Sequence, residues 1–297
     1  MPNYSYGGGG RRFHSRRRRN RALPLPLLLG VLVLALLAVA LAFFLRRPKG
    51  DKPSAAHANA KQSTEESTTA EVKSEDILAD AEKKAAQYDY DAAIAAIQAD
   101  EKTAQSEAGQ AAIAKYNEVK GTLVRQDPQK ITHVFFHTLI MDNKKAFDGD
   151  DRQNGYNDVM TTKSEFEKMM QAMYDKGYVL VRIHDVAHEE DDPATGGKKM
   201  VWGDIMLPPG KTAFVLSQDD VNYYEYMNGD GFAKDIIVGP NGKPMNEMVM
   251  DDGSVSVGAY DLVPILDEFI EKHPDFSYRG AKGIIAVTGY NGVFGYR

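Results

Sequence analysis

The sequence contains no cysteine among its 297 residues. This absence excludes disulfides, zinc–cysteine sites, iron–sulfur ligation and thiol catalysis. Acidic residues are missing from residues 1–50, which hold ten Lys and Arg, whereas residues 51–297 hold 26 basic and 42 acidic side chains. We therefore expect no nucleic-acid binding by the acidic bulk of the protein, because phosphate contacts need clustered Lys and Arg. A phosphate-binding loop, a dinucleotide-binding glycine fingerprint and a nucleophile elbow are also lacking.

One long apolar run stands near the start of the chain. It covers residues 27–45 without a charged side chain, and residues 22–26 extend it. At 1.5 Å per residue, these nineteen residues nearly span a membrane core of about 30 Å. The larger arginine cluster precedes the run, so we predict a cytoplasmic tail (1–21), a transmembrane helix (22–45) and an extracytoplasmic main domain. A cleaved signal peptide is the alternative, which the length of the run disfavours.

The next segments change from polar to helical. Residues 46–73 are rich in Ser, Thr, Ala, Lys and Glu without an apolar period, which predicts a flexible tether. Apolar residues then recur at helical spacing through residues 74–126. Residues 83–94 resemble one tetratricopeptide-type hairpin. A spacer or helical bundle packed on the next domain is favoured, because one repeat is too few for a solenoid.

Residues 127–297 have the pattern of an α/β domain. Short apolar runs predict strands, and amphipathic stretches predict helices. The expected strands are 131–137, 178–183, 212–217 and 283–288, and the expected helices are 164–176 and 261–272. We expect a capping box at Ser164 and Glu167, and a hairpin insertion at 235–258. Strands that alternate with helices favour a parallel sheet with covered faces, in a barrel or an open α/β fold.

The strongest candidate site is the pair Asp219-Asp220, which directly follows the apolar strand 212–217. Functional side chains of parallel α/β folds gather at the carboxyl ends of strands. Neighbouring side chains point in different directions, so one carboxylate can bind a metal while the other accepts a proton. The alternative interpretation is a helix cap or loop carboxylate.

Histidines offer weaker candidates. His133 and His137 lie four residues apart on a predicted strand, where about 13 Å separates them, too far to share one ion. His184 and His188 have the same spacing and precede four acidic residues. A surface metal site and a solvated loop both remain open for that pair. Asp251-Asp252-Gly253 repeats the paired carboxylates, but its glycine favours a hairpin turn.

The order of these segments resembles the polysaccharide deacetylases, the family with the nodulation-protein-B-like domain. Residues 134–137 (Val-Phe-Phe-His) are similar to an early strand of that family, and Gly177-Tyr178 is similar to the start of the next. Residues 216–221 (Leu-Ser-Gln-Asp-Asp-Val) resemble its first catalytic motif, Thr-Phe-Asp-Asp-Gly. Both carboxylates are kept, and the other motif positions hold Ser217, Gln218 and Val221. Residues 281–289 are similar to the family's next barrel strand.

The resemblance, which covers residues 130–297, implies a partial (β/α) barrel that removes acetyl groups from N-acetylated polysaccharide or peptidoglycan at the cell envelope. It implies that Asp219 is the general base and that Asp220 binds a divalent metal, zinc, which polarises the amide carbonyl.

The sequence departs from the family in one respect. The family's His-x-x-x-His metal motif, expected after residues 283–288, does not occur before Arg297, and His184 and His188 precede Asp219. The sequence is then either a fragment of a longer enzyme or a chain with an incomplete site. The alternative function is a non-catalytic envelope protein that binds glycans or other partners.

Overall fold

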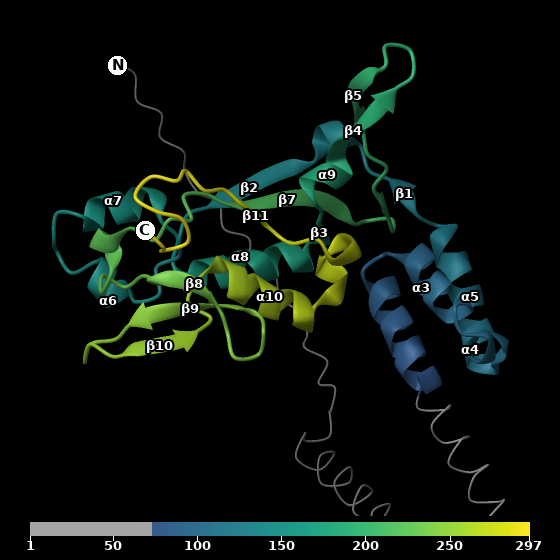
Figure 1. Ribbon diagram of the computed structural model, residues 1–297, viewed down its shortest axis with the longest axis horizontal. Helices are drawn as coiled ribbons and strands as arrows, with labels where there is room; N and C mark the ends of the chain where they lie inside the picture. Colours follow the sequence, from purple (N-terminus) through teal and green to yellow (C-terminus); the bar gives the residue numbers. More distant parts are fainter. Residues whose placement is uncertain (1–72) are drawn as a thin grey trace, which may run out of the picture. The chain divides into compact units, whose positions relative to one another are not determined.

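The computed structural model describes residues 73–297 (Figure 1). The predicted tail (1–21), the predicted transmembrane segment (22–45) and the tether up to residue 72 lie outside the described residues. The prediction of a single-pass membrane protein is corrected here. Across residues 73–297, no helix is both long and apolar enough to cross a membrane.

Helices form the first part of the described chain. Residues 73–86 are helical, and three helices follow, α3 (Tyr90–Gln98), α4 (Glu101–Gln105) and α5 (Glu107–Lys120). Their apolar faces pack into one cluster around Ile97 and Tyr116. The Tyr88 hydroxyl donates to the Asp275 carbonyl at 2.7 Å, and the Arg279 amide donates to the Gln87 carbonyl at 2.7 Å. These bonds join the helices to the α/β part of the chain.

A parallel sheet forms the centre of the α/β part. Its strands are β2 (Thr132–Phe136), β3 (Tyr178–Leu180), β7 (Thr212–Gln218) and β11 (Ile284–Ile285). Strand β7 pairs in parallel with each of the other three: β3 along its first residues, β2 along Phe214 to Gln218, and β11 along its last two residues. The prediction of an α/β fold with a parallel sheet is therefore confirmed.

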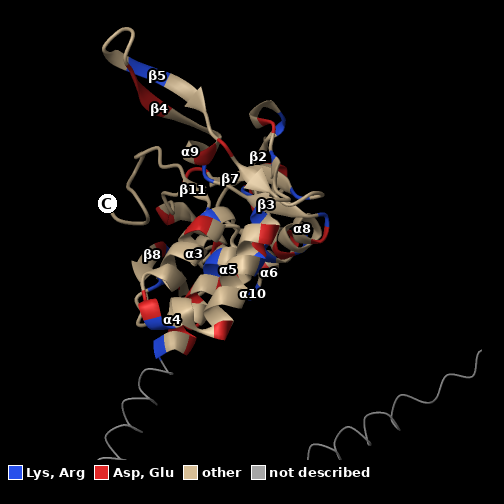
Figure 2. Cartoon of the chain, turned by 90° about the vertical axis from the view of Figure 1, so that its right-hand side faces the viewer, with Lys and Arg blue, Asp and Glu red and all other residues tan. Residues whose placement is uncertain are grey.

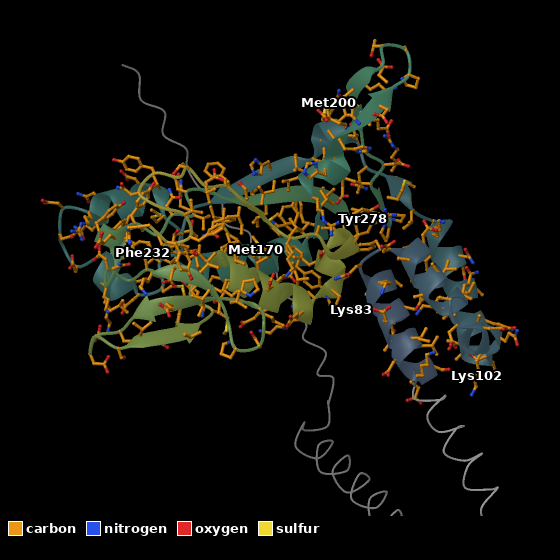
Figure 3. The ribbon with its side chains drawn as sticks, viewed as in Figure 1. Lys83, Lys102, Met170, Met200, Phe232 and Tyr278 are labelled. Atoms are coloured by element: carbon orange, nitrogen blue, oxygen red, sulfur yellow. The ribbon has the colours of Figure 1, made fainter. Side chains whose placement is uncertain are left out.

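The alternation of side chains along β7 divides the core into two clusters. Phe214 and Leu216 point to one face, which α8 (Lys163–Asp175) and α10 (Leu262–Lys272) cover. Met170 of α8 lies inside that layer (Figure 3). Ala213 and Val215 point to the other face, where they pack with Tyr278. Both faces of the central strand are buried at these positions, which explains its nearly continuous apolar sequence.

The remaining strands form small antiparallel sheets. β1 (Val124–Arg125) pairs with β6 (Met206–Leu207), and β4 (Ala187–Asp192) pairs with β5 (Gly197–Trp202) in a hairpin that is acidic on one strand and basic on the other (Figure 2). The predicted hairpin insertion is confirmed as β8 (Asp235–Val238), β9 (Pro244–Val249) and β10 (Val255–Gly258). Short helices complete the chain: α6 (Asn143–Ala146), α7 (Gln153–Val159), α9 (Ile183–Val186) and 3-10 turns at Pro128–Lys130, Glu225–Met227, Pro274–Phe276 and Tyr278–Gly280.

The predicted capping box of α8 was placed two residues too late. Thr162 is the N-cap: its hydroxyl oxygen accepts from the Glu165 amide, while the Glu165 carboxylate accepts from the Thr162 amide at 2.9 Å. Thr162 takes this role because its backbone is extended, with φ at −75° and ψ at 153°, whereas Ser164 already lies within the helix.

Candidate functional site

The turn Asp219-Asp220 follows the last residue of β7, at the carboxyl end of the parallel sheet. The Asp219 amide donates to the Phe136 carbonyl at 2.8 Å. On the other side, the Ala286 amide donates to the Gln218 carbonyl at 2.9 Å, and the Val221 amide donates to the Ala286 carbonyl at 3.2 Å. Main-chain hydrogen bonds to two neighbouring segments therefore fix where both carboxylates emerge.

A chain of polar side chains orients the Asp219 carboxylate. The Ser217 hydroxyl donates to Asp219 Oδ1 at 2.9 Å, and His133 Nε2 lies 2.9 Å from the Ser217 oxygen. Because Ser217 gives its single proton to Asp219, His133 Nε2 is the donor in the second bond. Ser217 is only 3% exposed, so its hydroxyl is held in one place. The period of two along a strand brings Ser217 and Asp219 to the same face, and this spacing is the sequence signal that points to Ser217.

The Asp220 backbone adopts a left-handed conformation. Its φ is 54°, Tyr223 follows with a φ of 52°, and neither residue is glycine. The Asn222 amide donates to the Asp220 carbonyl at 2.7 Å, which closes a tight turn. Such conformations cost about 1–3 kcal/mol each, and they cluster at functional sites. Tyr88, Arg279, Asn291 and Phe294 share this conformation, so the backbone fixes the direction of the Asp220 side chain without deciding between a functional site and a loop carboxylate.

The buried carboxylate of Asp261 accepts hydrogen bonds from residues on both sides of the Asp219-Asp220 turn. Gln218 Nε2 and the Tyr223 hydroxyl each donate to Asp261 Oδ2 at 2.7 Å, while the Leu139 and Leu262 amides donate to Oδ1. Asp261 is 0% exposed, and this burial raises the pKa of its carboxyl group. The network ties together Gln218, which precedes Asp219, and Tyr223, which lies three residues after Asp220. In the sequence, Asp261 is recognisable only as the start of a predicted helix.

The candidate metal ligands do not come together. Among residues 73–297 there is no group of three His, Cys, Asp or Glu side chains placed to hold a metal ion. His137 follows β2, and its Nδ1 lies 3.1 Å from the Val159 carbonyl. His184 lies in α9, while His188 lies in β4 beside Glu190. Asp251 and Asp252 occupy the turn between β9 and β10, as expected for a hairpin.

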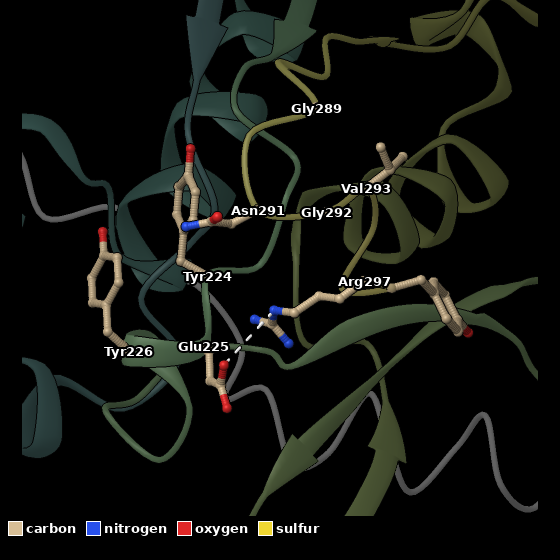
Figure 4. A pocket seen from close by; sticks show the side chains of 9 residues that line it. Tyr224, Glu225, Tyr226, Gly289, Asn291, Gly292, Val293 and Arg297 are labelled. Atoms are coloured by element: carbon tan, nitrogen blue, oxygen red, sulfur yellow. Dashed lines mark ion pairs between the residues drawn. The ribbon is translucent and has the colours of Figure 1, made fainter.

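An open cavity of about 900 Å³ lies at the segment after Asp220 (Figure 4). We call it the tyrosine cavity, because three of its lining residues are tyrosines. The lining residues are Tyr224, Glu225, Tyr226, Gly289, Asn291, Gly292, Val293, Tyr296 and Arg297. No motif in the sequence pointed to this cavity, because its two walls lie more than sixty residues apart.

Comparisons of the chain with protein-family models, curated proteins and solved structures gave no match. Fold and site together define an α/β protein with paired carboxylates at the end of its central parallel strand. The resemblance to the polysaccharide deacetylases stays a prediction that rests on its motifs.

Proposed function

We propose that the protein hydrolyses N-acetyl groups of glycans, with Asp219 as the general base. The observation that carries this proposal is the position of Asp219-Asp220 at the carboxyl end of β7, with the Asp219 carboxylate oriented by Ser217. Catalytic side chains of parallel α/β folds are typically found at this end of the sheet. The parallel pairing of β2, β3 and β11 with β7 supports an α/β fold, but β2 pairs with β7 and not with β3, the neighbour that a (β/α) barrel would give it.

The proposed chemistry assigns one proton transfer to this chain. An ionised carboxylate only accepts hydrogen bonds, and Ser217 occupies Oδ1 of Asp219. Oδ2 is then the atom that takes a proton from the attacking water as the water adds to the acetyl carbon. A separate acid protonates the leaving amine, so that acetate and a free amino sugar are released.

The metal part of the prediction is incomplete in the described residues. A catalytic zinc ion takes three protein ligands, and Asp220 would supply only one of them. The residues present therefore do not fit a whole zinc site, and we assign no reaction step to a metal. Asp220 as a ligand of zinc remains a prediction from the family resemblance.

Release of acetate tests the proposal. We expect the full-length protein to release acetate from an N-acetylglucosamine tetramer, and Asp219→Asn to lower this rate by at least about a hundredfold, because general bases contribute 10²–10⁴-fold. Asp251→Asn is the matched control, since Asp251 also begins an Asp-Asp pair but is exposed and paired with Lys145. Equal rates for Asp219→Asn and the wild type would contradict the proposal.

A second function is a glycan-binding protein without catalysis. The tyrosine cavity favours it. Binding of the tetramer without any acetate release would decide for this alternative.

A further inference from the structure

Three tyrosine side chains near the Asp219-Asp220 turn are unusually exposed. Tyr226 is 52% exposed, Tyr290 68% and Tyr296 60%. Large aromatic rings are normally buried, and exposed rings gathered at one place mark binding surfaces. Tyr226 and Tyr296 both line the tyrosine cavity, and the ring of Tyr290 lies against that of Tyr224 with a centroid distance of 6.4 Å.

The rings on one wall are held in place. Tyr224 and Tyr226 are stacked, with centroids 5.6 Å apart and an interplanar angle of 14°. The Arg152 guanidinium lies 5.9 Å from the centroid of Tyr226, and its Nη1 donates to the Tyr226 carbonyl at 3.2 Å. A rigid wall loses little conformational entropy when a ligand binds, so these contacts prepare the cavity for an occupant.

The same wall is connected to the carboxylate turn. Asn222, two residues after Asp220, donates from Nδ2 to the Tyr224 hydroxyl at 3.2 Å. The cavity volume of about 900 Å³ lies in the upper part of the range for small-molecule sites, about 300–1,000 Å³. Asp219 and Asp220 do not line the cavity, but its volume admits a ligand of several rings beside the segment that follows them.

We propose that the tyrosine cavity is a subsite for the sugar rings of an uncharged N-acetylated glycan. A sugar ring offers C–H groups on its faces and hydroxyl groups at its edge. The C–H faces suit the negative π-faces of tyrosine. Glu225, Asn291 and Arg297 supply acceptors and donors for the hydroxyls. Glu225 Oε2 lies 3.9 Å from Arg297 Nε, so the two opposite charges offset each other. A lining without net charge from this pair suits a neutral ligand. The choice of an N-acetylated glycan rests on the proposed function.

Binding of an N-acetylglucosamine tetramer, measured by titration calorimetry in the Asp219→Asn background, tests this subsite without turnover. We expect Tyr226→Leu and Tyr296→Leu each to weaken binding at least tenfold. Tyr226→Phe, which keeps the ring, should stay within threefold of the parent. Trp202→Leu is the control at an exposed aromatic residue of the β4–β5 hairpin, and it should leave binding unchanged. Circular dichroism of each variant shows whether it is folded.

The outcomes separate this inference from the proposed function. Weaker binding in the two leucine variants with full binding in Tyr226→Phe supports the subsite, whether or not the wild type releases acetate. Wild-type binding in both leucine variants overturns it. Weaker binding only in Trp202→Leu also overturns it and moves the glycan to the hairpin. If the wild type binds the tetramer but releases no acetate, the proposed hydrolysis is contradicted, while the subsite is still supported by the binding data.

Discussion

At the scale of single residues, the orientation of Asp219 depends on Ser217. The hydroxyl of Ser217 connects the carboxylate of Asp219 to the ring of His133 through two hydrogen bonds of 2.9 Å. A hydrogen bond to a charged group contributes about 1.5–3 kcal/mol. A general base that is free to rotate loses much of its advantage, because proton transfer requires the correct geometry. Ser217 is therefore a positioning residue for the proposed reaction.

We predict that Ser217→Ala lowers the kcat of acetate release by about tenfold or more while KM stays nearly constant. Ser217→Thr keeps the hydroxyl and should restore most of the rate. Steady-state kinetics of the two variants provides the measurement. A rise in KM with an unchanged kcat would mean that Ser217 acts in binding and does not position Asp219.

At the scale of the elements, the start of α8 shows how local chemistry sets an element's boundary. The Thr162 hydroxyl and amide both donate to the Glu165 carboxylate, and these bonds lower the pKa of Glu165 below its ordinary value of 4.5. A lowered pKa in the folded state means that the ionised form stabilises the fold. This stabilisation is present above about pH 4.5 and is lost as the pH falls through the folded-state pKa.

We predict that Glu165→Gln destabilises the protein at pH 7 and that the difference from the wild type shrinks below about pH 4.5. Urea unfolding at several pH values measures it. Glu167→Gln is the matched control, because Glu167 lies on the same helix but pairs only with Lys163 at 3.8 Å. A pH-independent difference for Glu165→Gln would contradict the role of its charge.

The elements also show what the sequence can and cannot predict. The strands 212–217 and 131–137 were predicted because short apolar runs favour strands, and β7 and β2 fall within one residue of these bounds. Burial on both faces is confirmed for β7, whereas β2 is mostly exposed, with Phe135 58% exposed. The capping box was misplaced because Thr162 and Ser164 carry the same chemistry, and only the backbone angles distinguish them. Asp219 was found because a carboxylate after a strand is a local pattern. The bond from Tyr223 to Asp261 spans 38 residues, and no local pattern reports it.

At the scale of the whole molecule, Asp261 connects elements that are far apart in the sequence. Its four hydrogen-bond donors come from the segment after β2, the end of β7, the turn after it and the start of α10. Tyr223 extends the network to Asn246 of β9 at 3.1 Å. Burial of this carboxylate is therefore balanced by hydrogen bonds that hold the sheet, the helix and the β9 strand together.

We predict that Asp261→Ala lowers the free energy of unfolding by at least about 3 kcal/mol, because each buried donor left without a partner costs about 1–3 kcal/mol. Asp261→Asn should cost less, since its carbonyl oxygen still accepts from the Leu139 and Leu262 amides. Asp252→Ala, at an exposed turn, is the control. Urea unfolding at pH 7 checks all three variants, and a loss for Asp261→Ala no larger than that of Asp252→Ala would refute the bracing role.

We propose that the Asp219-Asp220 turn hydrolyses N-acetyl groups of a glycan. The most direct test of this proposal is the stoichiometry of products when the full-length protein acts on the N-acetylglucosamine tetramer. We predict acetate and free amine in a ratio of one to one, formed by the wild type and not by Asp219→Asn. Intact tetramer after prolonged incubation, or acetate formed equally by Asp219→Asn, would contradict it.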